Sequence, residues 1–210
     1  TKQVKINQVE IPIRRKQKEN VNALRILHIS DLHLERLSIT PAQLKRYLHR
    51  EKFDLIALTG DFLNKKRSIP KLVPYLKVFR SLRPTYGMYA VLGNHDYVLK
   101  GSHLQKLKLI LQRYGCYVLI NEHVPIWIND QLINIVGIDD HSTNRSDVDA
   151  TFSTIHSGIN LVLTHDPNVV LEMKHVEFAY LLSGHFHGGQ IHWPKPYHLV
   201  KMGRLARMNM

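Results

Sequence analysis

Cysteine and long apolar runs are nearly absent from this chain of 210 residues. Cys116 is the only cysteine, so no disulfide can form within the chain and the redox compartment stays undecided. No apolar run approaches the ~20 residues of a membrane-spanning helix, and no signal peptide is visible. Residue 1 is Thr rather than Met, which leaves open an anchor or export signal ahead of it.

Acidic residues are also scarce. The chain has 17 Asp and Glu against 29 Lys and Arg, which gives a formal net charge of +12. Such a balance favours anionic partners, namely phosphorylated substrates, nucleic acid or acidic lipid headgroups. The hydrophobic content of 44% is ordinary for a globular protein, and the length fits a single domain over residues 1–210.

Short apolar segments alternate with amphipathic stretches along the chain. This pattern predicts strands at 24–29, 55–58, 89–92, 133–136, 161–163 and 179–182, and helices at 40–52, 68–82 and 102–114. Apolar alternation between residues 4 and 13 predicts an additional first strand. The alternation indicates an α/β domain whose strands are buried on both faces. In such sheets the ligand-binding residues gather at the carboxyl ends of the strands.

Five of the predicted strands are followed at once by side chains that bind metals. Imidazole, carboxylate and amide groups are ligands of divalent first-row metals. Each motif alone has an ordinary interpretation as a turn, a cap or a loop, but five of them at strand ends predict a metal centre. They are Asp31-Leu32-His33, Gly60-Asp61, Gly93-Asn94-His95-Asp96, Thr164-His165 and Gly184-His185-Phe186-His187-Gly188-Gly189.

The remaining histidines lack this context. His141 lies in a polar loop after a strand, where it either faces a cleft or is structural. The others are interpreted as surface groups or satisfied structural groups: His28, His49, His103, His123, His156, His175, His192 and His198.

The order D-x-H, G-D, G-N-H-D, T-H, G-H-x-H resembles the calcineurin-like metallophosphoesterases, over about residues 24–190. The ending G-H-F-H-G-G-Q resembles a bacterial subgroup with membrane-associated phosphodiesterases and UDP-2,3-diacylglucosamine hydrolases. The resemblance implies a four-layer αββα fold, in which two mixed sheets pack together and are flanked by helices. Members of this subgroup continue past G-G-Q with further strands, so it also implies that the C-terminal part of the sandwich is incomplete.

The resemblance further implies a binuclear metal site, with Mn²⁺ as the first choice and Fe or Zn as alternatives. One ion is assigned to Asp31, His33, Asp61 and His187, and the other to Asp61, Asn94, His165 and His185, so that Asp61 bridges them. His95 is implied to be a catalytic histidine that binds no metal, and Asp96 to orient it. A metal-bound hydroxide is implied to be the nucleophile.

Three functions fit these observations. The preferred one is hydrolysis of a lipid- or nucleotide-linked phosphodiester or pyrophosphate at a bacterial membrane. The basic loop Lys65-Lys66-Arg67 then steers anions, unless it is only solvated. The basic and apolar tail 193–210 then contacts an anionic membrane surface, unless it forms sandwich strands. The alternatives are a soluble, cytoplasmic phosphodiesterase or nuclease, with nucleic acid the less favoured partner, and a non-catalytic module, which predicts a broken ligand set.

Overall fold

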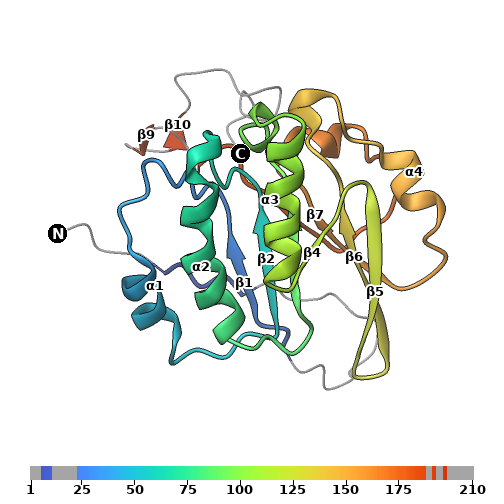
Figure 1. Ribbon diagram of the computed structural model, residues 1–210. Coiled ribbons are helices and arrows are strands. Elements are labelled where there is room, and N and C mark those ends of the chain that lie inside the picture. The colour runs from blue at the N-terminus through green and yellow to red at the C-terminus, as the bar shows by residue number, and fades with distance from the viewer. Residues whose placement is uncertain (1–5, 11–22, 188–190, 193–195, 198–210) are drawn as a thin grey trace.

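Two four-stranded sheets pack against each other (Figure 1). The computed structural model describes residues 6–10, 23–187, 191–192 and 196–197. The first sheet is parallel throughout, in the order β1 (Ile26–Ile29), β2 (Leu55–Thr59), β3 (Met88–Val91) and β4 (Cys116–Val118). The second sheet is mixed, with β5 (Glu122–Ile128) antiparallel to β6 (Gln131–Gly137), followed by the parallel β7 (Ile159–Leu163) and β8 (Tyr180–Leu182).

Helices cover the outer face of each sheet. The helices α1 (Pro41–Leu48), α2 (Ile69–Ser81) and α3 (Ser102–Arg113) pack on the first sheet. The short α4 (Val148–Ser153) packs on the second sheet together with the 3-10 turn η4 (Pro167–Leu171). Three other 3-10 turns follow strands or precede helices: η1 (Lys66–Ser68), η2 (Asp96–Val98) and η3 (His141–Thr143). These layers confirm the αββα architecture, although the first sheet is parallel rather than mixed.

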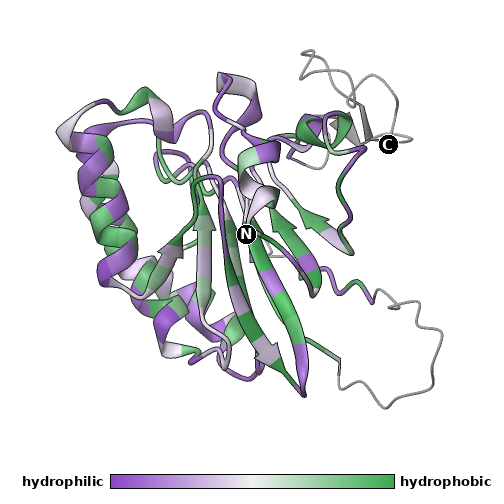
Figure 2. Cartoon of the chain, turned by 90° about the vertical axis from the view of Figure 1, so that its right-hand side faces the viewer, coloured by the Kyte–Doolittle hydropathy of each residue, from purple (hydrophilic) through white to green (hydrophobic). Residues whose placement is uncertain are grey.

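The alternation of side chains along β2 explains why this strand is wholly apolar. Leu55 and Ala57 face the second sheet, whereas Ile56 and Leu58 face the helices. Successive side chains of a strand point to opposite faces, and here both faces are covered. Figure 2 shows the same apolar character along the strands of both sheets. The carboxyl ends of the parallel strands are thereby fixed at one edge of the sandwich.

Most of the predicted elements are confirmed, with four differences. The helix α1 begins with the Thr40 capping box but ends at Leu48 rather than near residue 52. Gly101, not Ser102, occupies the N-cap of α3. Strands β4 and β5 and helix α4 were not predicted. Residues 6–10 form no strand, and the rest of the predicted strand, residues 4–5 and 11–13, lies outside the described residues.

The end of the chain is described only in part. A short antiparallel pair joins β9 (Ile191–His192) and β10 (Pro196–Tyr197). The other residues of the predicted membrane-contacting tail lie outside the described residues, as does Gly188-Gly189-Gln190. Within the described part of the chain, no helix has both the length and the apolar character to cross a membrane.

Candidate metal centre

All seven predicted ligands lie just beyond strand ends at the same edge of the sandwich. Asp31 and His33 follow β1, Asp61 follows β2 and Asn94 follows β3. His165 follows β7, and His185 and His187 follow β8. Because these strands run parallel within each sheet, their carboxyl ends meet and bring residues from distant parts of the chain together.

The backbone of these loops is strained where the predicted ligands sit. Five of the seven predicted ligands have a positive φ: Asp31 (53°), His33 (37°), Asp61 (54°), His185 (69°) and His187 (51°). A residue other than glycine in this left-handed region costs on the order of 1 kcal/mol or more. Such strain concentrates at functional sites, where the surrounding structure holds it.

Two glycines allow the loops to approach each other closely. A Cβ on Gly93 would overlap the carboxylate of Asp61 and come within 2.8 Å of the His165 ring. A Cβ on Gly184 would overlap Ser30 and lie 2.6 Å from a carboxylate oxygen of Asp31. Glycine is therefore required at both positions to let backbone pass beside the acidic side chains.

Asp61 lies at the centre of the cluster, with 1% of its surface exposed. Its Oδ2 is 3.3 Å from His165 Nε2 and 3.5 Å from His33 Nε2. Its Oδ1 accepts a hydrogen bond of 2.9 Å from the backbone N–H of His95. Burial opposes ionisation of Asp61, but its contacts with His165 and His95 hold the pKa below the usual value. The carboxylate is thus charged and flanked by imidazoles on two sides.

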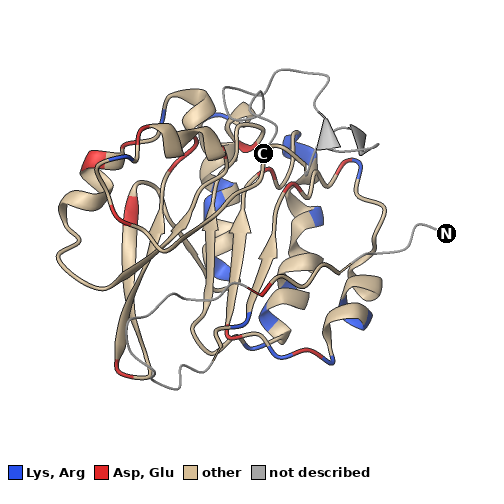
Figure 3. Cartoon of the chain, turned by 180° about the vertical axis from the view of Figure 1, so that it is seen from behind, with Lys and Arg blue, Asp and Glu red and all other residues tan. Residues whose placement is uncertain are grey.

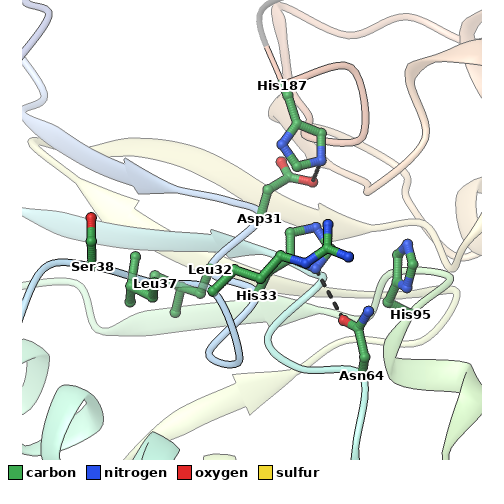
Figure 4. Close-up of a pocket in the computed structure, with 9 residues that line it drawn as sticks. Asp31, Leu32, His33, Leu37, Ser38, Asn64, His95 and His187 are labelled. Atoms are coloured by element: carbon green, nitrogen blue, oxygen red, sulfur yellow. Dashed lines mark hydrogen bonds and ion pairs between the residues drawn. The ribbon is translucent and has the colours of Figure 1, made fainter. Parts of the chain in front are cut away.

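Asp31 joins the second sheet to the first. Both of its oxygens lie 3.2 Å from the backbone nitrogen of His185, which donates to them. Its Oδ1 is also 3.4 Å from His187 Nε2 (Figure 4). His185 Nδ1 lies 3.1 Å from the amide oxygen of Asn94. The His187 ring stacks on that of His33, with centroids 5.2 Å apart. Every predicted ligand therefore touches at least one other.

The surroundings of His165 are those expected of a metal ligand. The side chain is fully buried, and Nδ1 lies 2.7 Å from the carbonyl oxygen of Thr59, to which it donates. Nε2 points at Asp61 yet has no hydrogen-bond partner among the described residues. Burial lowers the pKa of His165, but Asp61 and Asp31 outweigh it and raise the pKa to about 9. Metal-ligating histidines typically donate one ring N–H to a carbonyl or carboxylate and keep the other nitrogen for the ion, which is how His165 is held.

His33 is held in the same manner. Its Nδ1 lies 3.1 Å from the side-chain oxygen of Asn64, which leaves Nε2 facing Asp61. Asn64 was not singled out in the sequence, although its place three residues after Asp61 was a usable signal. Ligand atoms within 4.8 Å of one another form three groups, namely Asp31–His33–His187, His33–Asp61–His95 and Asp31–Asp61–His165. The donor set, rich in imidazole and carboxylate, suits divalent first-row metals.

The hydrogen bonds of Asp96 give it a role that was not predicted. Its Oδ1 accepts from the backbone N–H groups of Phe62 (2.9 Å) and Leu63 (3.3 Å), and its Oδ2 from that of Gly93 (3.0 Å). Among the described residues, no hydrogen bond joins it to the His95 ring. Asp96 is fully buried, and burial chiefly raises its pKa to about 7. It therefore ties together the loops after β2 and β3, and its expected role in orienting His95 stays a prediction.

His95 and His141 occupy different surroundings. The side chain of His95 is 41% exposed, and Nε2 lies 4.0 Å from Asp61 Oδ2, so its ring faces both the cluster and solvent. His141 lies 2.8 Å from Ser146 Oγ and 3.7 Å from Glu172, and it joins none of the three groups. The geometry leaves His95 available for chemistry and makes His141 a structural histidine.

A pocket of ≈ 470 Å³ opens beside the cluster, a size typical of small-molecule sites. Figure 4 shows Leu37 and Ser38 at one end and His95 at the other. Its cationic residue is Arg36, which was not singled out in the sequence. The predicted anion-steering residues Lys65-Lys66-Arg67 do not line this pocket. The lining residues are Asp31, Leu32, His33, Arg36, Leu37, Ser38, Asn64, His95 and His187.

Arg36 is held close to the cluster by its own backbone. Its N–H donates to the carbonyl of His33 at 2.7 Å, which closes a turn that starts at a predicted ligand. The neighbouring Glu35 carboxylate accepts from the backbone N–H groups of Asn64 and Lys65 at 2.9–3.1 Å. These contacts fix the loop after β1 against the loop after β2, so the pocket wall is anchored on both sides.

Comparisons with known proteins agree with this geometry. The calcineurin-like phosphoesterase family matches residues 24–189. The chain is 56% identical to the metallophosphoesterase YkoQ of Bacillus subtilis, covering 100% of this chain and 77% of that protein. It is 27% identical to the UDP-2,3-diacylglucosamine pyrophosphatase LpxG of Chlamydia muridarum, covering 84% and 68%. The chain spans 61%, 50% and 64% of three other bacterial relatives.

The fold is also found among solved structures. One crystal structure superposes with a TM-score of 0.53 at 12% identity, covering 86% of this chain and 87% of that one. At this identity the likeness concerns the fold alone. The ordered motifs, the family match and the relative at 56% identity lead to one conclusion: the chain belongs to the calcineurin-like phosphoesterases, a family of metal-dependent phosphoester hydrolases.

Proposed function

We propose that the protein hydrolyses a phosphodiester or pyrophosphate bond in a lipid- or nucleotide-linked substrate near a membrane, using two divalent metal ions. The supporting observation is the position of Asp61 Oδ2, which lies 3.5 Å from His33 Nε2 on one side and 3.3 Å from His165 Nε2 on the other. The Asp61 carboxylate could therefore bind an ion on each side. Asp31, His33 and His187 would complete the first ion's ligands, and Asn94, His165 and His185 the second's.

The residues divide the chemistry between them. When bound, two divalent ions lower the pKa of a coordinated water and offset the charge of the phosphoryl group. His95 lies in the pocket wall with an exposed ring, so it can donate a proton to the leaving oxygen. General acid catalysis of this kind typically contributes ~10²–10⁴-fold. Asp31 and Asp61 hold the imidazoles in place through the contacts described above.

The pocket supports a substrate larger than a simple phosphate. Arg36 offers a guanidinium, the group best suited to hold phosphoryl oxygens, while Leu32 and Leu37 offer apolar surface. The name of LpxG places a lipid-linked pyrophosphate among the substrates of a relative. We extend that substrate class to this chain as part of the proposal, with Mn²⁺ as the preferred metal and Fe²⁺ or Zn²⁺ as alternatives.

Metal-stripped protein resupplied with Mn²⁺, Fe²⁺ or Zn²⁺ tests the proposal. The substrates are bis(p-nitrophenyl) phosphate, p-nitrophenyl phosphate and a UDP-linked pyrophosphate. We expect metal-dependent turnover with a preference for diester or pyrophosphate over monoester. Asp61→Asn should lower turnover by at least about 10³-fold, since metal binding contributes several kcal/mol to the reaction. Asp130→Asn, in the exposed turn between β5 and β6, serves as the control.

The possible outcomes test the metal requirement and the substrate class separately. Elemental analysis should find two ions per wild-type chain and fewer in Asp61→Asn. Turnover that survives complete metal removal, or an Asp61→Asn variant as active as Asp130→Asn, would contradict it. A preference for the monoester would retain the metal centre but overturn the substrate class, and cleavage of oligonucleotides alone would favour a nuclease.

A further inference from the structure

The two halves of the sandwich carry opposite charge. Residues 23–118, which form the first sheet and its helices, hold 17 Lys and Arg against six Asp and Glu, a formal difference of +11. Residues 119–187, which form the second sheet and α4, hold two against nine, a difference of −7. Figure 3 shows Lys and Arg over the helices of the first sheet and Asp and Glu around α4. Across residues 23–187, positive and negative charge are therefore divided between the two layers of the sandwich.

The outer helices of the first half contain no acidic residue at all. Together α1, α2 and α3 carry eight cations and no Asp or Glu, and all but the partly buried Lys108 are exposed. In the described part of the chain, none of the eight forms an ion pair, because the single Lys or Arg pair there joins Arg25 to Glu51. The eight are Lys45, Arg46, Lys71, Lys77, Arg80, Lys106, Lys108 and Arg113.

Apolar side chains accompany these cations. Tyr47 on α1 is 41% exposed and Leu109 on α3 is 54% exposed. Basic helices that also present aromatic and aliphatic groups are typical of surfaces that lie on lipid headgroups. A surface that binds nucleic acid would instead present several aromatic platforms along a basic groove. The described part of the helix layer presents a single exposed aromatic side chain, Tyr47.

We propose that the layer formed by α1, α2 and α3 is a docking face for an anionic lipid surface. The cations attract acidic headgroups, while the acidic half is repelled, so the molecule binds in one orientation. This inference deepens the membrane context of the proposed function and assigns it to described residues rather than to the tail. Arg36, which belongs to the cationic half, lines one wall of the pocket.

Vesicle binding of the whole chain tests the docking face. The vesicles are phosphatidylcholine with or without phosphatidylglycerol, and binding is measured by flotation at increasing salt. We expect binding only to the anionic vesicles, with affinity falling as salt rises. A triple variant, Lys71→Gln, Lys77→Gln and Arg80→Gln, should bind about 100-fold more weakly, because each cation near the surface contributes roughly a factor of five.

A variant with restored net charge tests whether vesicle binding depends on the α1–α3 layer or on the total charge of the protein. The α2 triple is combined with Asp130→Asn, Glu172→Gln and Glu177→Gln, three exposed acidic residues of the other half, which restores the net charge of the wild type. If the face binds lipid, the combined variant stays as weak as the α2 triple. Recovery of wild-type affinity would mean that net charge alone drives binding and would overturn the inference.

Turnover of the soluble bis(p-nitrophenyl) phosphate is followed in parallel and tests the proposed function separately. The substituted residues lie outside the candidate metal centre, so all variants should hydrolyse this substrate equally. Two results would overturn the assignment of an anionic lipid surface. In the first, the wild-type protein binds neutral vesicles as tightly as anionic ones. In the second, it binds a DNA oligonucleotide but not vesicles that contain phosphatidylglycerol. Absent turnover with face-dependent vesicle binding would overturn the proposed reaction and leave the docking face standing.

Discussion

The two sheets contribute different chemistry to the same site. Loops after the first sheet provide both central carboxylates, Asp31 and Asp61, and are braced by acceptors that bind backbone N–H groups. Loops after the second sheet provide imidazoles, His165, His185 and His187, which reach across to those carboxylates. Neither sheet alone provides all of the predicted ligands. The site is therefore a consequence of sheet packing, and its geometry depends on every contact that joins the two halves.

His95 gives the sharpest test of this division, because it is an exposed imidazole that comes from the carboxylate-bearing half. We expect His95→Gln to keep both ions and to lose ~10²–10⁴-fold in kcat, the usual contribution of a general acid. His165→Gln should instead lose an ion, since its buried Nε2 faces Asp61. Metal content and kcat are measured for both variants beside His141→Gln, a histidine outside the cluster.

Two results would change the roles assigned to His95 and His165. Loss of an ion from His95→Gln to the same degree as from His165→Gln would make His95 a ligand, as the His33–Asp61–His95 group allows. A His95→Gln variant with full metal content and wild-type kcat would remove its catalytic role altogether.

Asp96 tests whether the first half is braced by buried carboxylates. Asp96→Ala leaves three backbone donors, those of Phe62, Leu63 and Gly93, without their acceptor. Each orphaned donor costs roughly 1–3 kcal/mol, so the free energy of unfolding should fall by about 3 kcal/mol or more. Asp96→Asn keeps one acceptor oxygen and should lose less. Urea unfolding of metal-free protein measures both, so that metal binding does not contribute.

A contrasting result for Asp96 is also informative. Equal stability of Asp96→Ala and wild type would show that water replaces the carboxylate and that the loops need no brace. Asp96→Asn with intact stability and a lowered kcat would support the expected role of Asp96 beside His95.

The strand-end motifs were predictable because each one is local in sequence. Short apolar strands are recognisable from their composition, and the first predicted ligand follows two or three residues after each strand ends. The bracing role of Asp96 was not predictable, because its partners Phe62 and Leu63 are 34 and 33 residues away. Its contact with them exists only once β2 and β3 lie side by side.

Strand β5 escaped prediction for a different reason. It carries Pro125, which removes a backbone donor and argues against a strand in sequence reasoning. The proline is tolerated because β5 lies at the edge of its sheet and pairs only with β6. Likewise, the charge division is visible as residue counts, but its meaning depends on the two halves of the chain forming opposite layers. Arg36 is an exposed loop cation that only the pocket distinguishes from other basic residues.

Tyr97 probes the smallest of these effects, a single contact between the halves. Its hydroxyl, on η2 of the first half, donates to the carboxylate of Asp139, at 2.6 Å and 2.7 Å from the two oxygens. Asp139 follows β6 in the second half and is 3% exposed, and Arg145 lies 4.1 Å above the Tyr97 ring. Burial and the nearby Asp139 raise the pKa of Tyr97, so the hydroxyl stays protonated and able to donate.

Tyr97→Phe removes this bond without changing the shape of the ring. The loss should be about 1.5 kcal/mol, the lower end for a hydrogen bond to a charged group, and should lower the melting temperature by roughly 3–6 °C. Tyr117→Phe is the control, since its ring is 55% exposed and stacks on Tyr89. Its hydroxyl forms no hydrogen bond with any residue in the described part of the chain. If both variants melt together, the hydroxyl does not join the halves, and the apolar interface between the sheets alone holds the two sets of ligands in register.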